Sequence, residues 1–168
     1  MILSKDIILK EIQDKRVKIS PFDRSSVSAG AISLKLSDKI RVYKKPSRIT
    51  LSENSDSSKY SELISIKKGY ILKPGELVLA ITKEKVCLAD DICGWLQTRS
   101  RVARLGLMTH LTSNFIQPGV QNHQVLELFN AGPHELVLKP GQRLCKLVLE
   151  RIEGHAVYKG RYKNQQTL

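Results

Sequence analysis

Short apolar segments separated by glycine or proline recur through most of this sequence, and they constrain its fold more than any other feature. The segments are closely spaced and rich in Val, Ile and Leu. That pattern is typical of the strands of an all-β sandwich or barrel. We expect strands over residues 31–36, 39–43, 63–66, 70–72, 77–82, 92–97, 107–112, 124–129, 135–138 and 143–152.

One helix is expected before the strands. Ser4 is a good N-cap, and Ile7, Ile8 and Ile12 share one helical face until about Lys15.

Turn sequences lie between the strands. Pro-Gly pairs at 74–75 and 140–141 lie in two similar segments, where proline presets φ and glycine allows a positive φ. We interpret them as two equivalent hairpin corners. Residues 46–61 are rich in Ser, Asn, Asp and Lys and predict a long, mobile surface loop.

The length of 168 residues fits one domain with its own core. No apolar run approaches the roughly 18 residues of a membrane span, and the first residues lack the order of a secretory signal. We therefore expect a cytoplasmic protein with no membrane association. Cys87, Cys93 and Cys145 are odd in number and widely spaced in apolar surroundings, which favours buried free thiols.

The charge balance favours phosphorylated partners. Lys and Arg number 28 against 16 Asp and Glu, a net charge of +12. The few aromatic residues do not interleave with basic clusters, so we do not expect a nucleic-acid partner. A nucleoside triphosphate uses a basic surface equally well, and a merely solvated basic surface is the plain alternative.

Several familiar catalytic signatures are missing. None of the four histidines stands in H-x-E, and no P-C-x-x-C follows, so the zinc deaminase pattern is absent. The sequence also lacks a P-loop and a dinucleotide-binding glycine motif. Ser100 could be imagined as a nucleophile, but nothing orders a triad around it.

The segment 99–104 is the best candidate for an anion site. It reads Arg-Ser-Arg-Val-Ala-Arg at an expected strand-to-helix transition, where guanidiniums and free amides can hold phosphate oxygens. A basic surface turn is the alternative. Further on, Glu127 interrupts a strand-like apolar run and is a candidate proton carrier, although an outward-facing glutamate on a half-exposed strand would look the same.

The sequence resembles the dCTP deaminase family of the wider dUTPase-like superfamily. Residues 94–107 are similar to the family motif G-W-L-x-x-R-S-S-x-A-R-L-G-L, 116–119 to I-D-P-G, 125–130 to V-L-E-x-x-N, and 162–166 to the tail K-Y-x-x-Q-Q. The resemblance runs from the opening helix to the tail.

This resemblance implies a mainly β chain: a distorted, jelly-roll-like dUTPase barrel with a short N-terminal helix and one short helix after the Arg-Ser motif. It implies a single domain over 1–168, a nucleotide-covering tail over 155–168, and a homotrimer with three sites between subunits. The implied reaction is zinc-independent hydrolysis of dCTP to dUTP and ammonia, with Mg²⁺ on the triphosphate and dTTP as an inhibitor.

The resemblance also implies roles for individual residues. Glu127 is expected to be the general acid/base, with Ser100 and Arg104 completing the catalytic surroundings. The expected substrate-binding residues are Arg99, Ser100, Arg101, Val102, Ala103 and Arg104 at the phosphates, Gln117, Val125, Leu126 and Glu127 at the base and sugar, and Tyr158, Arg161 and Gln165 from the tail.

A single carboxyl group fits the chemistry of this reaction. Water must lose a proton, the ring nitrogen must gain one, and the leaving amine must receive another, and one carboxyl group can carry all three. We expect the apolar neighbours Val125, Leu126, Leu128 and Phe129 to raise the pKa of Glu127 toward neutrality.

The sequence departs from the family pattern at several positions. Arg101 replaces the second motif serine, Arg161 replaces the tail lysine, Ser33 stands where the family has aspartate, and Val-Gln-Asn at 120–122 replaces W-x-G. Gln117 stands where deaminases and dUTPases usually carry aspartate.

Gln117 also separates the rival functions. In dUTPases the equivalent aspartate activates the water that attacks the α-phosphate, and glutamine cannot act as a base. The sequence therefore favours a dCTP deaminase over a dUTPase or a bifunctional deaminase/diphosphatase. A catalytically inactive nucleotide-binding protein is the third interpretation.

Overall fold

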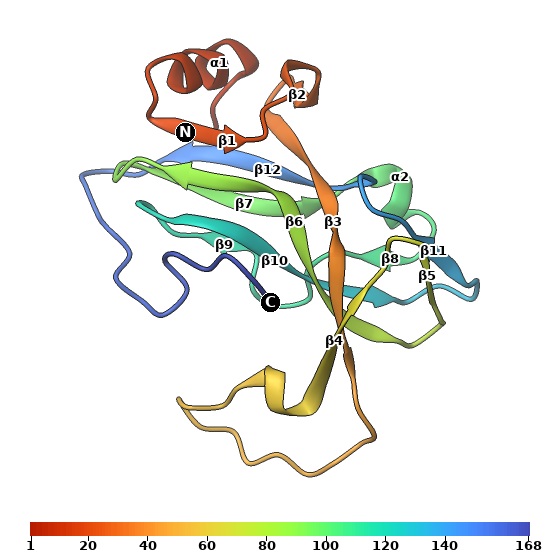
Figure 1. Cartoon of the computed structure of the whole chain (residues 1–168). Helices are drawn as coiled ribbons and strands as arrows, with labels where there is room; N and C mark the ends of the chain where they lie inside the picture. Colours follow the sequence, from red (N-terminus) through yellow and green to blue (C-terminus); the bar gives the residue numbers. More distant parts are fainter.

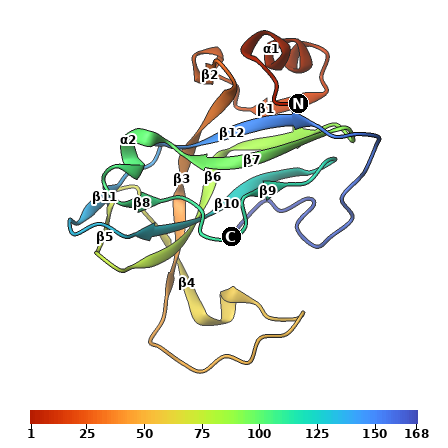
Figure 2. The ribbon, with the colours of Figure 1, turned by 180° about the vertical axis from the view of Figure 1, so that it is seen from behind.

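A strongly curled sheet of ten strands forms the body of the protein in this computed structural model, which describes residues 1–168 (Figures 1 and 2). Its main path runs β8-β10-β6-β3-β12-β7-β9, and β5 and β11 form a separate two-stranded sheet. The strands are β1 Val17–Ser20, β2 Val27–Ser28, β3 Ala31–Tyr43, β4 Ser61–Ser65, β5 Tyr70–Leu72, β6 Leu77–Leu88, β7 Ile92–Thr98, β8 Leu107–Met108, β9 Phe115–Ile116, β10 Gln121–Asn130, β11 Leu136–Leu138 and β12 Arg143–Arg151.

The core fills the inside of the curled sheet because apolar residues alternate along its long strands. In β10, for example, Leu126 and Leu128 are almost fully buried, while Val125 and Glu127 on the other face are half-buried. Burying each such leucine contributes about 1.5–3 kcal/mol. The alternation thus fixes which side chains of β10 can reach a ligand and which belong to the core.

Two short helices complete the fold: α1 (Lys5–Gln13) and α2 (Ser100–Ala103). Both lie where the sequence predicts them, and the expectation of a mainly β chain with two short helices is confirmed. Ile8 is fully buried, but Ile7, which was expected on the same face, is 40% exposed. Neither helix has the length and apolar content needed to cross a membrane.

A network of charged residues fastens α1 to the sheet. The nearly buried carboxylate of Glu11 accepts hydrogen bonds from Arg16 and Arg151. Both arginines also donate to Asp91. Four side chains distant in sequence thereby join the helix to β7 and β12.

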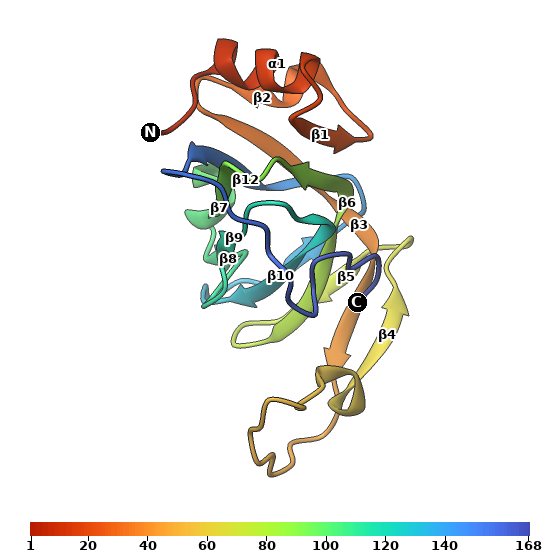
Figure 3. The same cartoon turned by 90° about the vertical axis from the view of Figure 1, so that its left-hand side faces the viewer.

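Strand β3 is continuous, so the prediction of two short strands over 31–36 and 39–43 is wrong in this respect. The pairing of β3 with β6 shifts between Leu36 and Ile40, which marks a bulge at the polar residues between them. Beyond the bulge, β3 pairs with β4 and extends away from the barrel as an arm (Figure 3). Residues 44–60 form the end of this arm and are mostly exposed. Their one regular element is the 3₁₀ turn Ser57–Tyr60.

The two Pro-Gly turns, at 74–75 and 140–141, are corners between sheets. The interpretation of these turns as hairpin corners is therefore wrong. Gly75 and Gly141 have φ values of 75° and 82°, as such turns require. However, β5 pairs with β11, whereas β6 and β12 continue into the large sheet. Each turn therefore passes the chain from the small sheet to the large one.

The three cysteines carry free thiols. Cys93 and Cys145 are buried and Cys87 is half-buried. Burial raises the pKa of Cys145 to about 12, so this thiol stays protonated and behaves as a core residue.

Candidate functional site

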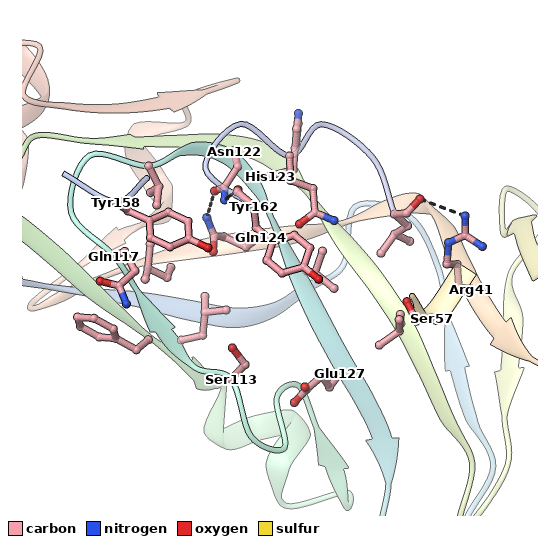
Figure 4. A pocket seen from close by; sticks show the side chains of 18 residues that line it. Arg41, Ser57, Ser113, Gln117, Asn122, His123, Gln124, Glu127, Tyr158 and Tyr162 are labelled. Atoms are coloured by element: carbon pink, nitrogen blue, oxygen red, sulfur yellow. Dashed lines mark hydrogen bonds between the residues drawn. The ribbon is translucent and has the colours of Figure 1, made fainter. Parts of the chain in front are cut away.

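A pocket of about 410 Å³ lies between β10, the loop that precedes it and the C-terminal tail (Figure 4). Its wall includes five residues that the sequence analysis assigned to a nucleotide site: Gln117, Val125, Glu127, Tyr158 and Gln165. The pocket therefore gathers residues that are distant in sequence, from Arg41 to Leu168.

Glu127 is the only acidic side chain in the pocket wall. It lies on the face of β10 that is turned away from the core, and its Oε2 atom accepts hydrogen bonds from the backbone amides of Leu111 (2.7 Å) and Thr112 (2.8 Å). Its Oε1 atom accepts a third from the Thr112 hydroxyl at 3.0 Å. A loop about 15 residues earlier in the chain thus fixes both carboxylate oxygens.

The pKa of Glu127 is lowered, so the prediction of a raised pKa is wrong for this environment. Partial burial does raise the pKa, but the hydrogen bonds from Thr112 and Leu111 together lower it by more. The expected apolar surroundings are also incomplete, because Leu126 and Leu128 point into the core. The carboxylate is ionised at neutral pH and can act first as a proton acceptor.

An open stretch of strand edge lies beside this carboxylate. One edge of β10 pairs with β6. On the other edge, the backbone amides of Gln121 and His123 donate to carbonyls of the tail, and further along Phe129 pairs with β8. Because backbone groups alternate along a strand, the amide and carbonyl of Val125 and Glu127 face this edge between the tail and β8. Neither residue has a strand partner there, so the edge can pair with the donors and acceptors of a planar heterocycle.

The arginine segment does not share this pocket. None of residues 99–104 lines its wall, and Ala103 instead lines a second hollow of about 360 Å³ beside Gly106 and His110. Arg99 donates to the hydroxyl of Ser33, where the family pattern has an aspartate. Within one chain, the predicted phosphate cradle and Glu127 are therefore separate.

The arginines of this segment keep their positive charge unpaired. Arg99, Arg101 and Arg104 have no carboxylate within 4.0 Å, whereas Arg16, Arg143 and Arg151 are each paired with one or two. Arg101 and Arg104 are also exposed, as is Ser100. An exposed group of uncompensated guanidiniums next to a helix start is well suited to bind phosphate oxygens.

Other predicted site residues have mixed placements. The side chain of Leu126 is in the core, so only its backbone can meet a ligand, and Val102 packs partly against the core. Arg161 lies outside the pocket wall, with its guanidinium 5.8 Å from the ring centre of Tyr162. The sequence analysis missed Arg41, Asn122, Gln124 and Tyr162, which line the pocket. Of these, Asn122 was marked in the sequence as part of a departure from the family pattern, and Tyr162 as part of the tail motif.

Comparisons with known proteins identify the family of the chain. The model of the dCTP deaminase-like family matches residues 2–152. A protein of Pseudoalteromonas atlantica named dCTP deaminase is 38% identical over 95% of this chain and 88% of its own length. A protein of Parafrankia sp. named "dCTP deaminase, dUMP-forming" is 33% identical over 99% of this chain and 87% of its own.

Two solved structures show the same fold. The dCTP deaminase of Agrobacterium tumefaciens superimposes with a TM-score of 0.70 at 19% identity, covering 88% of this chain and 47% of the other, so this chain spans about half of its length. The dUTPase of Staphylococcus bacteriophage 80alpha, in complex with dUpNHpp, gives a TM-score of 0.51 at 11% identity, covering 86% and 96% of the two chains. At such identities the likeness establishes a dUTPase-like fold. Together with the family match and the relatives, it means that this chain belongs to the dCTP deaminase-like family.

Proposed function

We propose that this protein hydrolyses dCTP to dUTP and ammonia, in the pathway that supplies deoxyuridine nucleotides. The observation that carries the proposal is the position of Glu127, an ionised carboxylate in the pocket wall beside the unpaired edge of β10. A cytosine ring that pairs with this edge would bring its C4 amino group and its N3 atom close to the carboxylate. The family of the chain supports the choice of a pyrimidine nucleotide.

Glu127 would then carry the protons of the reaction. As water adds to C4, the carboxylate takes a proton from the water and passes it to N3, forming a tetrahedral intermediate. The resulting carboxylate takes the remaining hydroxyl proton and gives it to the departing amine, so ammonia leaves and the C4 carbonyl forms. The lowered pKa of Glu127 keeps the carboxylate in the ionised form that the first step requires.

We further propose that the complete site forms between subunits of a homotrimer. Arg99, Ser100 and Arg104 lie outside the Glu127 pocket, and the two arginines have no carboxylate partner. A neighbouring subunit that presented this segment to the pocket would supply the charge that the triphosphate needs. Arg101 would add a further cation at the same place.

Mg²⁺ is assigned to the triphosphate of the substrate. The chain offers no group of three or more His, Cys, Asp or Glu side chains arranged to hold a metal ion. Phosphate oxygens are suitable ligands for Mg²⁺, which commonly binds together with substrate phosphates. The bound ion would reduce the negative charge of the triphosphate, while Arg99 and Arg104 would orient it.

The product is proposed to be dUTP because the pocket holds Gln117 where dUTPases use an aspartate. An amide cannot take the proton of a water that attacks the α-phosphate, and Gln117 lines the same pocket as Glu127. The second candidate is a bifunctional enzyme that releases dUMP. It is favoured by relatives such as those of Parafrankia and Streptomyces coelicolor, which are named dUMP-forming.

One incubation separates these functions. The purified full chain is incubated with dCTP and Mg²⁺, and dCTP, dUTP, dUMP and pyrophosphate are separated by ion-exchange chromatography. Accumulated dUTP supports the proposal, whereas dUMP with pyrophosphate indicates the bifunctional enzyme. Unchanged dCTP refutes both, and consumption of added dUTP would then indicate a dUTPase.

Further arms of the same assay test the effectors. Omitting Mg²⁺ should weaken dCTP binding, whereas a zinc-selective chelator should leave the rate unchanged. Added dTTP should inhibit. If dCTP or dUTP binds without any turnover, the protein is a nucleotide binder and not an enzyme.

A further inference from the structure

The C-terminal tail is attached to the edge of β10 by hydrogen bonds of its own. The amides of Gln121 and His123 donate to the carbonyls of Lys163 (2.9 Å) and Gln165 (3.0 Å). These partners are two residues apart on both segments, so the turn at residues 161–164 and the residue after it are held along the edge of β10. The segment attached in this way carries Tyr162 and Gln165 into the pocket wall.

A buried side-chain contact reinforces this attachment. The Nδ2 atom of Asn122 donates to the carbonyl of Tyr162 at 2.7 Å, and its Oδ1 atom accepts from Nε2 of Gln124 at 2.6 Å (Figure 4). The backbone amide of Gln124 in turn donates to the hydroxyl of Thr82 at 2.9 Å. A continuous chain of hydrogen bonds therefore runs from β6 through β10 to the tail.

The residues that form this series of hydrogen bonds are buried, which makes the contact with the tail specific. Asn122, Gln124 and Thr82 are only 8%, 7% and 1% exposed. With the tail in place the amide of Asn122 is shielded from water and its donor is satisfied, so this hydrogen bond favours the closed tail. The carbonyl of Tyr162 is the protein partner of that donor, and it is available only when the tail lies against β10.

We propose that Asn122, oriented by Gln124, is a positioning residue that holds the tail over the pocket before the nucleotide arrives. The proposal rests on the proposed function in so far as the pocket is the dCTP site. Asn122 stands where the family motif W-x-G has glycine, so this device belongs to the present sequence and not to the motif. It leaves the chemistry of Glu127 untouched.

The expected effect follows from the population of the closed tail. If the tail is already closed, dCTP does not have to order it on binding. The apparent affinity for dCTP is then close to that of the closed form, because few molecules have an open tail. Loss of the contact with Asn122 should raise the fraction of molecules with an open tail and so raise the KM for dCTP. The kcat should change little, because saturating nucleotide still selects the closed tail.

The test uses Asn122→Asp, which keeps an acceptor for Gln124 but places a carboxylate oxygen opposite the carbonyl of Tyr162. Asn122→Gly is the second variant, which removes the side chain without burying a charge. Asn164→Ala is the matched control, since this exposed tail amide makes no side-chain hydrogen bond. Thermal unfolding of each variant checks that the barrel is intact.

The first readout is limited trypsin digestion of the nucleotide-free proteins, followed by intact mass spectrometry. Trypsin can cut the tail after Lys159, Arg161 and Lys163. We expect the tail to be cleaved about fivefold to tenfold faster in both Asn122 variants, because loss of one hydrogen bond shifts the equilibrium toward the open tail by about this factor. The rate of cleavage should be unchanged in Asn164→Ala. Equal cleavage in the wild type and in a folded Asn122 variant would overturn the proposal.

The second readout is the steady-state kinetics of dCTP deamination. The KM should rise about twofold in the Asn122 variants, less than the rise in cleavage, because the closed fraction falls only from near one to about one half while the open fraction rises severalfold. The kcat should stay within about twofold of the wild type. A fall in kcat at unchanged KM would refute the positioning role. If the wild type proves not to deaminate dCTP, the proposed function fails, but the digestion still decides whether Asn122 holds the tail.

Discussion

Thr112 holds the carboxylate of Glu127 at both oxygens. Its backbone amide donates to Oε2 at 2.8 Å, and its hydroxyl donates to Oε1 at 3.0 Å. Both bonds favour the ionised form, so the loop that carries Thr112 sets the protonation state of the proposed catalytic group. Five predictions follow from this and the neighbouring contacts.

Glu127→Gln should abolish deamination. The amide keeps the shape of the side chain but cannot carry protons, so kcat should fall by at least about 10² to 10⁴. Binding of dCTP, measured by calorimetry, should be largely retained. Glu135→Gln changes an exposed glutamate outside the pocket and should leave kcat unchanged. A Glu127→Gln protein that keeps more than a tenth of the activity would show that another group carries the protons.

Thr112→Val should move the acidic limb of the pH profile of kcat/KM to higher pH. In the wild type the lowered pKa of Glu127 keeps the carboxylate ionised, and activity is lost only as pH falls through that pKa. Removing the hydroxyl removes one bond to the anion, so protonation begins at a higher pH. Thr50→Val, an exposed change on the arm, is the control. An unmoved limb in Thr112→Val would mean that this limb does not report Glu127.

Mixing two inactive variants should restore activity if the site is shared between subunits. Glu127→Gln and Arg104→Ala should each be inactive alone. After unfolding and refolding together, mixed trimers contain sites in which Glu127 of one subunit meets Arg104 of another. We expect a fraction of wild-type dUTP formation from the mixture, measured against each variant refolded alone. No recovery in trimers shown by mass spectrometry to be mixed would place both residues in the same subunit's site.

Truncation after Gly154 should leave the barrel folded but weaken dCTP binding and turnover. The removed tail supplies Tyr158 and Gln165 to the pocket wall, and only Tyr158 packs against the main core cluster. The Tm should therefore fall by no more than a few degrees, a shift on the scale of about 1 kcal/mol. Calorimetric titration with dCTP and a thermal melt provide the check. Full activity in the truncated protein would remove the tail residues from the site.

Gly106→Ala should destabilise the fold more than Gly75→Ala. Both glycines have positive φ, 90° and 75°, so both substitutions carry backbone strain of order 1–3 kcal/mol. At Gly106 the new methyl carbon would also lie 2.4 Å from the Cα atom of Gly132, whereas nothing lies within 4 Å of it at Gly75. Urea unfolding should rank the variants in that order. Equal losses of unfolding free energy in the two variants would mean that the segments around Gly106 and Gly132 move apart at little cost.

The sequence predicted elements whose signals are local. The apolar run over 124–129 predicted the strand that carries Glu127, and the strand-to-helix transition at 99–104 predicted α2. Longer-range relationships were missed. The Pro-Gly turns at 74–75 and 140–141 have the local chemistry of hairpins, but the pairing of β5 with β11 joins segments more than 60 residues apart.

The site shows the same division. The sequence predicted the strand that carries Glu127, but not the direction of its pKa shift, because the deciding donors come from Leu111 and Thr112 in another segment. Asn122 was visible as an unusual residue, yet its partner Tyr162 lies 40 residues away. Arg41 gave no signal at all, since a lone arginine in a strand resembles any exposed cation.

The arm formed by β3 and β4 has a consequence for the evolution of the family. Its base is closed by a regular ladder from Lys39 opposite Ser65 to Tyr43 opposite Ser61, so the residues beyond Tyr43 do not determine the register of the sheet. Insertions or deletions between 44 and 55, ahead of the turn that carries Ser57 to the pocket wall, then cost little more than the entropy of a longer or shorter loop. Descendants of a common ancestor can therefore differ in length at this place while the pocket stays the same.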